Sequence, residues 1–198
     1  MVFKKSLYPL LPKNYDFGKR RNTFRRTLEL LDERKAKILV ETGTARNGLK
    51  NTKTDGASTI VFGSWAKQND AYIYSIDSDL EAIAFAQKAV LQLELKEHVE
   101  FINDDSIAFL YSFQQQIDFL YLDSFDYDKK DKNQQQLSQE HHLKEFQAVE
   151  EQLHPQSVVL IDDCKLPGGG KGKLVIEYML KKGWQIVVNR YQCLLCPG

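Results

Sequence analysis

Short apolar runs rich in β-branched residues alternate with longer helical patterns from residue 38 onward. This alternation predicts βαβ units and a parallel sheet, because parallel strands need long crossover connections that are usually helical. The last two runs have little sequence between them, so they predict an antiparallel hairpin. The predicted strands cover residues 38–41, 72–76, 99–102, 117–122, 158–161, 184–188 and 191–195.

Helical patterns and two polar loops fill the remaining sequence. Ser78 or Asp79 is the predicted N-cap of a helix that follows the second strand. Further helices are predicted over residues 23–33, 138–153 and 173–182. The polar segments 46–56 and 126–142 are predicted as long loops. Both follow strands at their carboxyl ends, where open α/β sheets bind ligands, so a functional role is favoured over disorder.

The size and composition suit one compact domain. The chain has 198 residues, of which 42% are hydrophobic and 27% charged. We expect a single domain over 1–198, with 1–35 as an N-terminal helical extension or lid and 36–198 as the core. Three cysteines are too few for a secreted disulfide framework, and no apolar run approaches the ~18 residues that span a bilayer. These features predict a cytoplasmic protein without a membrane partner.

The charges are balanced overall but unevenly distributed. Residues 1–37 carry eleven basic and four acidic side chains, a balance of +7, and the remaining residues carry −7. The basic segment could bind a phosphate or an acidic partner, but a solvated helix face is the more common explanation. Sparse aromatic residues and the absence of zinc-finger spacing argue against a nucleic-acid partner.

Acidic and glycine-containing turns follow three successive predicted strands. The first strand ends in Glu41, Gly43 and Thr44, and its loop returns through Gly56, Ser58 and Thr59 to a helix. Glycines allow close approach of a ligand, and free amides at a helix start can donate to it. Asp77 with Ser78 could accept from a ribose diol, with helix capping as the alternative. Asp105 could accept from an adenine amine, and Ser106 could cap the next helix.

The sequence resembles the class I S-adenosylmethionine-dependent methyltransferases. The segments ILVETGTARNG, YIYSIDSD, VEFINDDS and IDFLYLDSFDYD look like the four successive motifs of that family, followed by VVLIDDC. The resemblance implies a Rossmann-like α/β fold with helices on both faces of a seven-stranded sheet of order 3-2-1-4-5-7-6, strand 7 being antiparallel. It also implies that Glu41, Gly43 and Thr44 line the methionine portion, Asp77 the ribose, and Asp105 with Ser106 the adenine.

A second group of acids follows the fourth and fifth strands. Asp123, Asp162 and Asp163 should converge at the sheet edge, where their mutual repulsion favours a bound cation. Their arrangement is similar to that of metal-dependent O-methyltransferases, which implies a Mg²⁺-like ion. The alternatives are helix capping and hydrogen bonding to a substrate.

Three residues are candidates for the catalytic base. They are Asp123, Asp126 and His142, the last of which lies beside His141 at the predicted start of a helix. A histidine at a helix start is also an ordinary surface residue. The glycine-rich run at 167–173 lacks the Ser or Thr of a phosphate loop and is interpreted as a mobile rim, with a lysine available to an anionic acceptor.

The leading hypothesis is therefore an enzyme that transfers a methyl group from S-adenosylmethionine to an oxygen of a small molecule or sugar, with metal assistance. The alternative is a non-catalytic Rossmann-like module that binds S-adenosylmethionine or a nucleotide. A nicotinamide oxidoreductase is disfavoured, because the G-x-G-x-x-G turn is missing. A second copy of the chain is a further candidate partner, as a homodimer.

Overall fold

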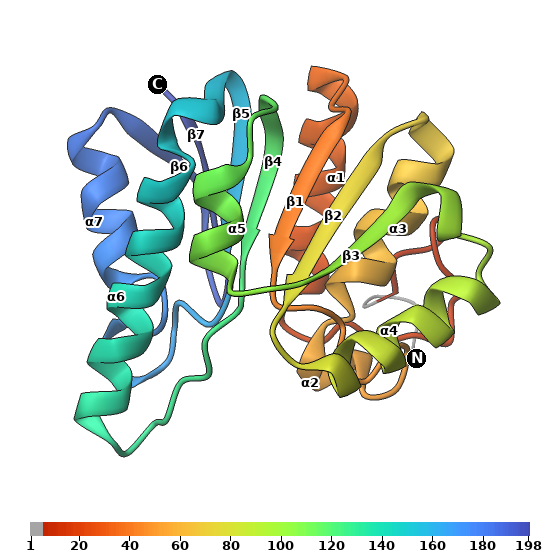
Figure 1. Cartoon of the computed structure of the whole chain (residues 1–198), viewed down its shortest axis with the longest axis horizontal. Helices are drawn as coiled ribbons and strands as arrows, with labels where there is room; N and C mark the ends of the chain where they lie inside the picture. Colours follow the sequence, from red (N-terminus) through yellow and green to blue (C-terminus); the bar gives the residue numbers. More distant parts are fainter. Residues whose placement is uncertain (1–5) are drawn as a thin grey trace.

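A computed structural model describes residues 6–198 as one mixed sheet with helices on both faces (Figure 1). The strand order is β3-β2-β1-β4-β5-β7-β6, and β7 runs antiparallel to both of its neighbours. The strands are β1 (Ile38–Thr42), β2 (Tyr72–Asp77), β3 (Val99–Asn103), β4 (Ile117–Leu122), β5 (Leu153–Ile161), β6 (Trp184–Asn189) and β7 (Cys193–Pro197). The predicted fold, strand order and terminal hairpin are confirmed.

The register of the central strands aligns their carboxyl ends. Thr42 of β1 pairs with Ile76 of β2 and with Leu122 of β4. Leu122 pairs in turn with Ile161 of β5. The residues that follow these positions therefore emerge along one edge of the sheet, and the candidate site lies there.

Helices cover both faces of the sheet. The first face carries α1 (Arg21–Arg34), α3 (Ser58–Asn69) and α4 (Leu80–Gln92). The second carries α5 (Ser106–Ser112), α6 (Lys132–Ala148) and α7 (Lys173–Lys181). Short turns complete the described elements: α2 (Thr52–Asp55), η1 (Lys96–His98), η2 (Glu150–Gln152) and η3 (Pro167–Gly169).

Helix α1 packs into the core of the fold. Its Phe24 is fully buried and packs edge-on against Phe62 of α3, with ring centroids 5.5 Å apart. Phe62 packs in turn against Phe119 of β4. Such aromatic contacts contribute beyond simple area burial. The predicted extension 1–35 is thus integral to the fold from residue 6; residues 1–5 lie outside the described part of the chain.

Helix α6 begins earlier than the sequence pattern predicts. The Asp131 side chain accepts hydrogen bonds from the backbone N–H groups of Asn133 and Gln134, which caps the helix. The glutamine-rich run therefore forms helical turns, although we predicted a loop there. The helix ends at Ala148, and η2 leads into β5, which begins at Leu153. Within the other predicted loop, α2 forms a single turn.

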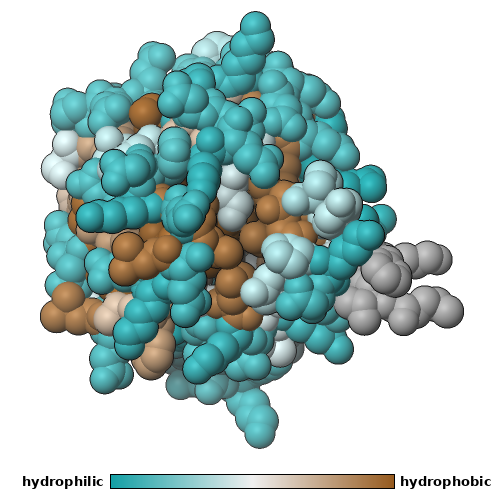
Figure 2. Space-filling model, turned by 90° about the vertical axis from the view of Figure 1, so that its right-hand side faces the viewer, coloured by the Kyte–Doolittle hydropathy of each residue, from teal (hydrophilic) through white to brown (hydrophobic). Residues whose placement is uncertain are grey.

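The surface on the α3 and α4 side is mostly hydrophilic, with apolar side chains in its central hollow (Figure 2). Helix α4 exposes Leu80, Phe85 and Leu91. Among the described residues, no helix combines the length and apolar character needed to cross a bilayer.

Candidate active site

A cavity of about 270 Å³ lies at the carboxyl ends of β1 to β4, and we call it the strand-end cavity. It is lined by Gly43, Ile76, Asp77, Ser78, Asp104, Asp105, Ser106, Ser124, Phe125 and His141. Five of these were predicted from the sequence to bind a cofactor: Gly43, Asp77, Ser78, Asp105 and Ser106. The aligned strand register brings them together from separate turns.

Asp77 is fixed in this cavity by backbone donors. The N–H of Thr44 donates to one carboxylate oxygen at 3.0 Å, and the N–H of Asp79 donates to the other at 2.9 Å. The adjacent turn needs glycine: Gly43 has φ +84°, and a Cβ there would lie 2.6 Å from the carbonyl oxygen of Asp123. The alternative prediction for Asp77 was helix capping, but the side chain that caps α4 is that of Asp79. Asp77 therefore presents a pre-oriented carboxylate to the cavity.

A buried carboxylate that the sequence did not reveal organises the opposite wall. Glu145 of α6 accepts hydrogen bonds from Ser106 and Ser124, both at 2.6 Å, and lies 3.2 Å from the Nε2 atom of His141. Burial opposes its ionisation, but these donors outweigh burial and lower the pKa of Glu145 to about 2. The ring of His141 packs against Phe125 at 5.0 Å between centroids. His141 and Glu145 are four residues apart on one helix, and this spacing is the sequence feature from which their contact could have been predicted.

Asp105 takes the helix-capping role that was expected of Ser106. Asp105 caps α5 by accepting from the N–H of Ala108, whereas the Ser106 hydroxyl donates to Glu145. Both residues still line the strand-end cavity.

Two predicted cofactor residues lie behind the cavity wall. Glu41 is fully buried, and its Oε1 atom accepts hydrogen bonds from Thr59 and Ser75. Burial raises the pKa of Glu41 to about 7. Thr59 is also fully buried and accepts from the N–H of Ala45. These side chains support the first turn from below, so their expected direct contact with the cofactor is corrected.

A second cavity, of about 230 Å³, is strongly polar, and we call it the charged cavity. It is lined by Arg20, Thr44, Arg46, Thr54, Asp55, Ser58, Asp123, Asp126, Asp163 and Lys171. The predicted residues Thr44 and Ser58 therefore lie here. Gly56 lies against Arg20, because a Cβ on it would approach the Arg20 Cδ to 2.7 Å.

A third hollow connects the two cavities. It shares Asp77, Ser124 and Phe125 with the strand-end cavity, and it shares Arg46 and Asp126 with the charged cavity. The three hollows thus form one trough along the sheet edge.

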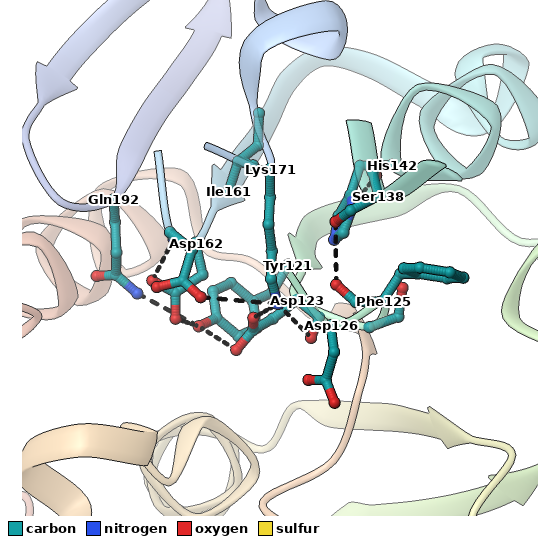
Figure 3. Close-up of polar contacts among 12 residues, drawn as sticks. Tyr121, Asp123, Phe125, Asp126, Ser138, His142, Ile161, Asp162, Lys171 and Gln192 are labelled. Atoms are coloured by element: carbon teal, nitrogen blue, oxygen red, sulfur yellow. Dashed lines mark hydrogen bonds and ion pairs between the residues drawn. The ribbon is translucent and has the colours of Figure 1, made fainter. Parts of the chain in front are cut away.

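Two buried ion pairs form the floor of the charged cavity. Figure 3 shows the one between Lys171 and Asp123. The Lys171 Nζ atom lies 2.6 Å from the Oδ1 atom of Asp123. The Arg20 Nε atom lies 2.6 Å from the Oδ2 atom of Asp162, which also accepts from the Tyr121 hydroxyl at 2.7 Å. Burial alone would raise the pKa of Asp162, but Arg20 and Tyr121 hold it below its usual value.

The family model described as "Methyltransferase domain" matches residues 54–164, more than half of the chain. The chain belongs to the class I S-adenosylmethionine-dependent methyltransferases. No curated protein sequence matches it significantly. Several solved structures share the fold of this chain at low sequence identity to it.

One similar structure is a Staphylococcus aureus protein described as a caffeoyl-CoA O-methyltransferase, with 16% identity and a TM-score of 0.66, covering 90% of this chain and 84% of that one. Another is the Podospora anserina methyltransferase PaMTH1 bound to S-adenosylhomocysteine, with 12% identity, a TM-score of 0.64 and coverage of 90% and 79%. A Clostridium thermocellum protein described as an rRNA methylase has 15% identity, a TM-score of 0.56 and coverage of 87% and 94%.

The carboxylates of this methyltransferase do not fit the expected metal site. Asp123, Asp162 and Asp163 do converge as predicted, but Lys171 and Arg20 already pair with them. Within residues 6–198, no group of three or more His, Cys, Asp or Glu side chains is placed to hold a metal ion. The residues predicted to bind Mg²⁺ instead form buried ion pairs with Lys171 and Arg20 in this structure.

The three candidate bases differ in accessibility. Asp123 lines the charged cavity, and burial raises its pKa to about 8 against the opposing charge of Lys171. Asp126 also lines that cavity, but its side chain is 74% exposed and pairs with Arg46. His142 is fully buried, its Nδ1 atom lies 2.6 Å from the Ser138 carbonyl oxygen, and burial lowers its pKa to about 4. His142 lines neither cavity, so its expected catalytic role is corrected, and its neighbour His141 lines the strand-end cavity instead.

Proposed function

We propose that this methyltransferase methylates an oxygen of a small polar acceptor, such as a sugar hydroxyl, in the charged cavity. The observation that supports this proposal is the position of Asp123, which lines a polar cavity joined to the strand-end cavity. A pocket lined mainly by charged side chains suits a hydroxylated acceptor better than a flat apolar ring.

The strand-end cavity suits the adenosine part of S-adenosylmethionine. Asp77 offers a carboxylate to the ribose diol, and the rings of Phe125 and His141 offer an aromatic wall to adenine. When bound, S-adenosylmethionine supplies an electrophilic methyl group on a sulfonium centre. The acidic residues of the trough favour that positive charge.

Asp123 is the base in this proposal. Its carboxylate lines the charged cavity, where it can take the proton of an acceptor hydroxyl as the oxygen is methylated. The walls of the trough align the acceptor with the methyl group, which contributes through proximity and orientation.

A screen with a radiolabelled methyl donor tests the function. The panel contains sugars, phenols, carboxylic acids, amines and short RNAs, the last because one similar structure is described as an rRNA methylase. We expect label on an oxygen of a small polar compound. Label only on nitrogen, carbon or RNA would contradict the proposal. Tight binding of S-adenosylhomocysteine without turnover across the panel would favour the non-catalytic alternative.

A further inference from the structure

The acidic cluster of the charged cavity contains its own counter-ions. Lys171 lies 2.6 Å from Asp123 and 3.9 Å from Asp163, and its side chain is only 4% exposed. Arg20 lies 2.6 Å from Asp162 and 3.7 Å from Asp163, with its side chain 6% exposed. When all three carboxylates are ionised, two monovalent cations leave the same net charge, −1, as one divalent ion would.

A glycine-rich loop places the Lys171 ammonium at this position. A Cβ on Gly170 would lie 1.9 Å from the carbonyl oxygen of Asp163, and a Cβ on Gly172 would lie 2.6 Å from the Cys164 sulfur. The Gln139 amide also donates to the carbonyl oxygens of Gly168 and Gly170. The loop therefore packs tightly against the end of β5, and this close packing explains the glycine run without a phosphate ligand.

Lys171 pairs with Asp123, the proposed base, whereas Arg20 pairs with Asp162. The Arg20 guanidinium is anchored through Asp162 and the carbonyl oxygen of Thr54. Lysine carries three N–H donors, and within the described residues Lys171 donates to the side chain and the carbonyl oxygen of Asp123. One N–H thus remains for an oxygen in the charged cavity, which Lys171 lines.

We propose that Lys171 is the built-in cation of this methyltransferase and performs the task that a divalent ion performs in metal-dependent relatives. This inference rests on the proposed function. Lys171 donates to the acceptor oxygen, and Asp123 receives the hydroxyl proton. The oxygen then forms a bond to the methyl carbon, and the electron pair of the broken carbon–sulfur bond stays on sulfur.

The arrangement has a consequence for the acceptor. A divalent ion can bind two neighbouring acceptor oxygens, whereas the free N–H of Lys171 can hold one. The acceptor therefore needs only a single hydroxyl at the reacting position, and a second oxygen beside it is not required for binding.

Mn²⁺ binding tests the inference without knowledge of the acceptor. Electron paramagnetic resonance should detect no bound Mn²⁺ in the wild type at millimolar ion. Lys171→Ala removes the ammonium from the carboxylates, so this variant should bind Mn²⁺ at least tenfold more tightly than the wild type. Lys171→Gln keeps a hydrogen-bond donor for Asp123 and should fold even where the alanine variant does not, and it should gain the same affinity. Lys173→Ala is the matched control, because Lys173 is exposed at the start of α7, two residues further on, and should not affect Mn²⁺ binding.

Two results would overturn the inference: bound Mn²⁺ in the wild type with loss of methyl transfer on chelation, or folded Lys171 variants that bind Mn²⁺ no more tightly than the wild type. Affinity for S-adenosylhomocysteine reports folding of the variants and tests the proposed function separately. A wild type that binds S-adenosylhomocysteine but methylates no acceptor would contradict the proposed function. The Mn²⁺ measurement would still test whether Lys171 replaces a divalent ion.

Discussion

The carboxylate of Asp77 is held in a fixed orientation by the backbone without any ligand. Both of its carboxylate oxygens accept backbone N–H groups, from Thr44 and Asp79. An amide side chain has only one acceptor oxygen, so asparagine would leave one of these donors facing an NH₂ group. The residue thus holds the first turn and the ribose site in one geometry.

Asp77→Asn should weaken binding of S-adenosylhomocysteine by about 1–3 kcal/mol, because hydrogen-bonding groups lose their partners. Isothermal titration calorimetry measures this change. Asp70→Asn is the control, since Asp70 is an exposed carboxylate just before the opposite end of β2. Equal affinities of the two variants would remove Asp77 from the cofactor site.

Asp123 should give the reaction a characteristic pH dependence. Burial raises the pKa of Asp123 to about 8, and a base must be deprotonated to act. We expect kcat/KM to rise about tenfold per pH unit below that value and to level off above it. Asp123→Asn should lose at least about 100-fold in kcat/KM together with this rise.

Asp118 provides the control for this measurement, because it lies in β4, the strand that Asp123 follows. Its carboxylate accepts from the N–H groups of Lys37 and Ile38 at the other end of the sheet. Asp118→Asn should retain the pH profile. A profile that persists in Asp123→Asn would assign the base to another residue.

Among the structural elements, the loop between β5 and α7 has the strongest backbone requirement. Gly170 adopts φ 66° and ψ −169°, a region that is essentially restricted to glycine. Gly183, at the end of α7, also has positive φ, at +91°, but a Cβ on it would meet nothing within 4 Å. The two glycines therefore separate the effect of backbone strain from that of a steric clash.

Gly183→Ala should cost about 1–2 kcal/mol in free energy of unfolding, the typical penalty for a left-handed non-glycine residue. Gly170→Ala adds a clash with Asp163 and should cost clearly more, about 3 kcal/mol or above. Urea denaturation of both variants measures the difference. Equal losses would show that the loop relaxes freely and does not fix Lys171.

The elements also show which parts of the site could be predicted from sequence. Gly43, Asp77 and Asp105 lie at or just after strand ends, and parallel register fixes where those ends lie. Lys171 reaches the site because of the path of the loop before α7, and Arg20 because of the packing of α1. Neither can be predicted from local sequence periodicity. The acids Asp123, Asp162 and Asp163 were therefore predicted correctly in position, but their counter-ions were missed.

At the scale of the whole molecule, burial of Glu41 links stability to pH. The carboxyl titrates near 4.5 when exposed and near 7 in the folded protein. Between these values the folded state keeps a proton that the unfolded chain has released, so the contribution of Glu41 to stability is complete below pH 4.5 and is lost as the pH rises through 7. Over this interval the loss amounts to about 3 kcal/mol.

Glu41→Gln mimics the neutral carboxyl and lacks this titration. Its free energy of unfolding, relative to the wild type, should therefore increase by about 3 kcal/mol from pH 4 to pH 8. Denaturant titrations at both pH values measure the change, and other titrating groups cancel in the comparison. Glu97→Gln, at an exposed position, should follow the wild type. A constant difference between Glu41→Gln and the wild type would contradict a buried neutral carboxyl.

The trough along the sheet edge gives the molecule one continuous site from β3 to β5. A crystal structure of the protein with S-adenosylhomocysteine tests this assignment most directly. We expect the adenosine in the strand-end cavity, with the ribose on Asp77 and the sulfur directed toward Asp123 and Lys171. Electron density for the ligand at any other place, with the strand-end cavity free of it, would contradict the assignment.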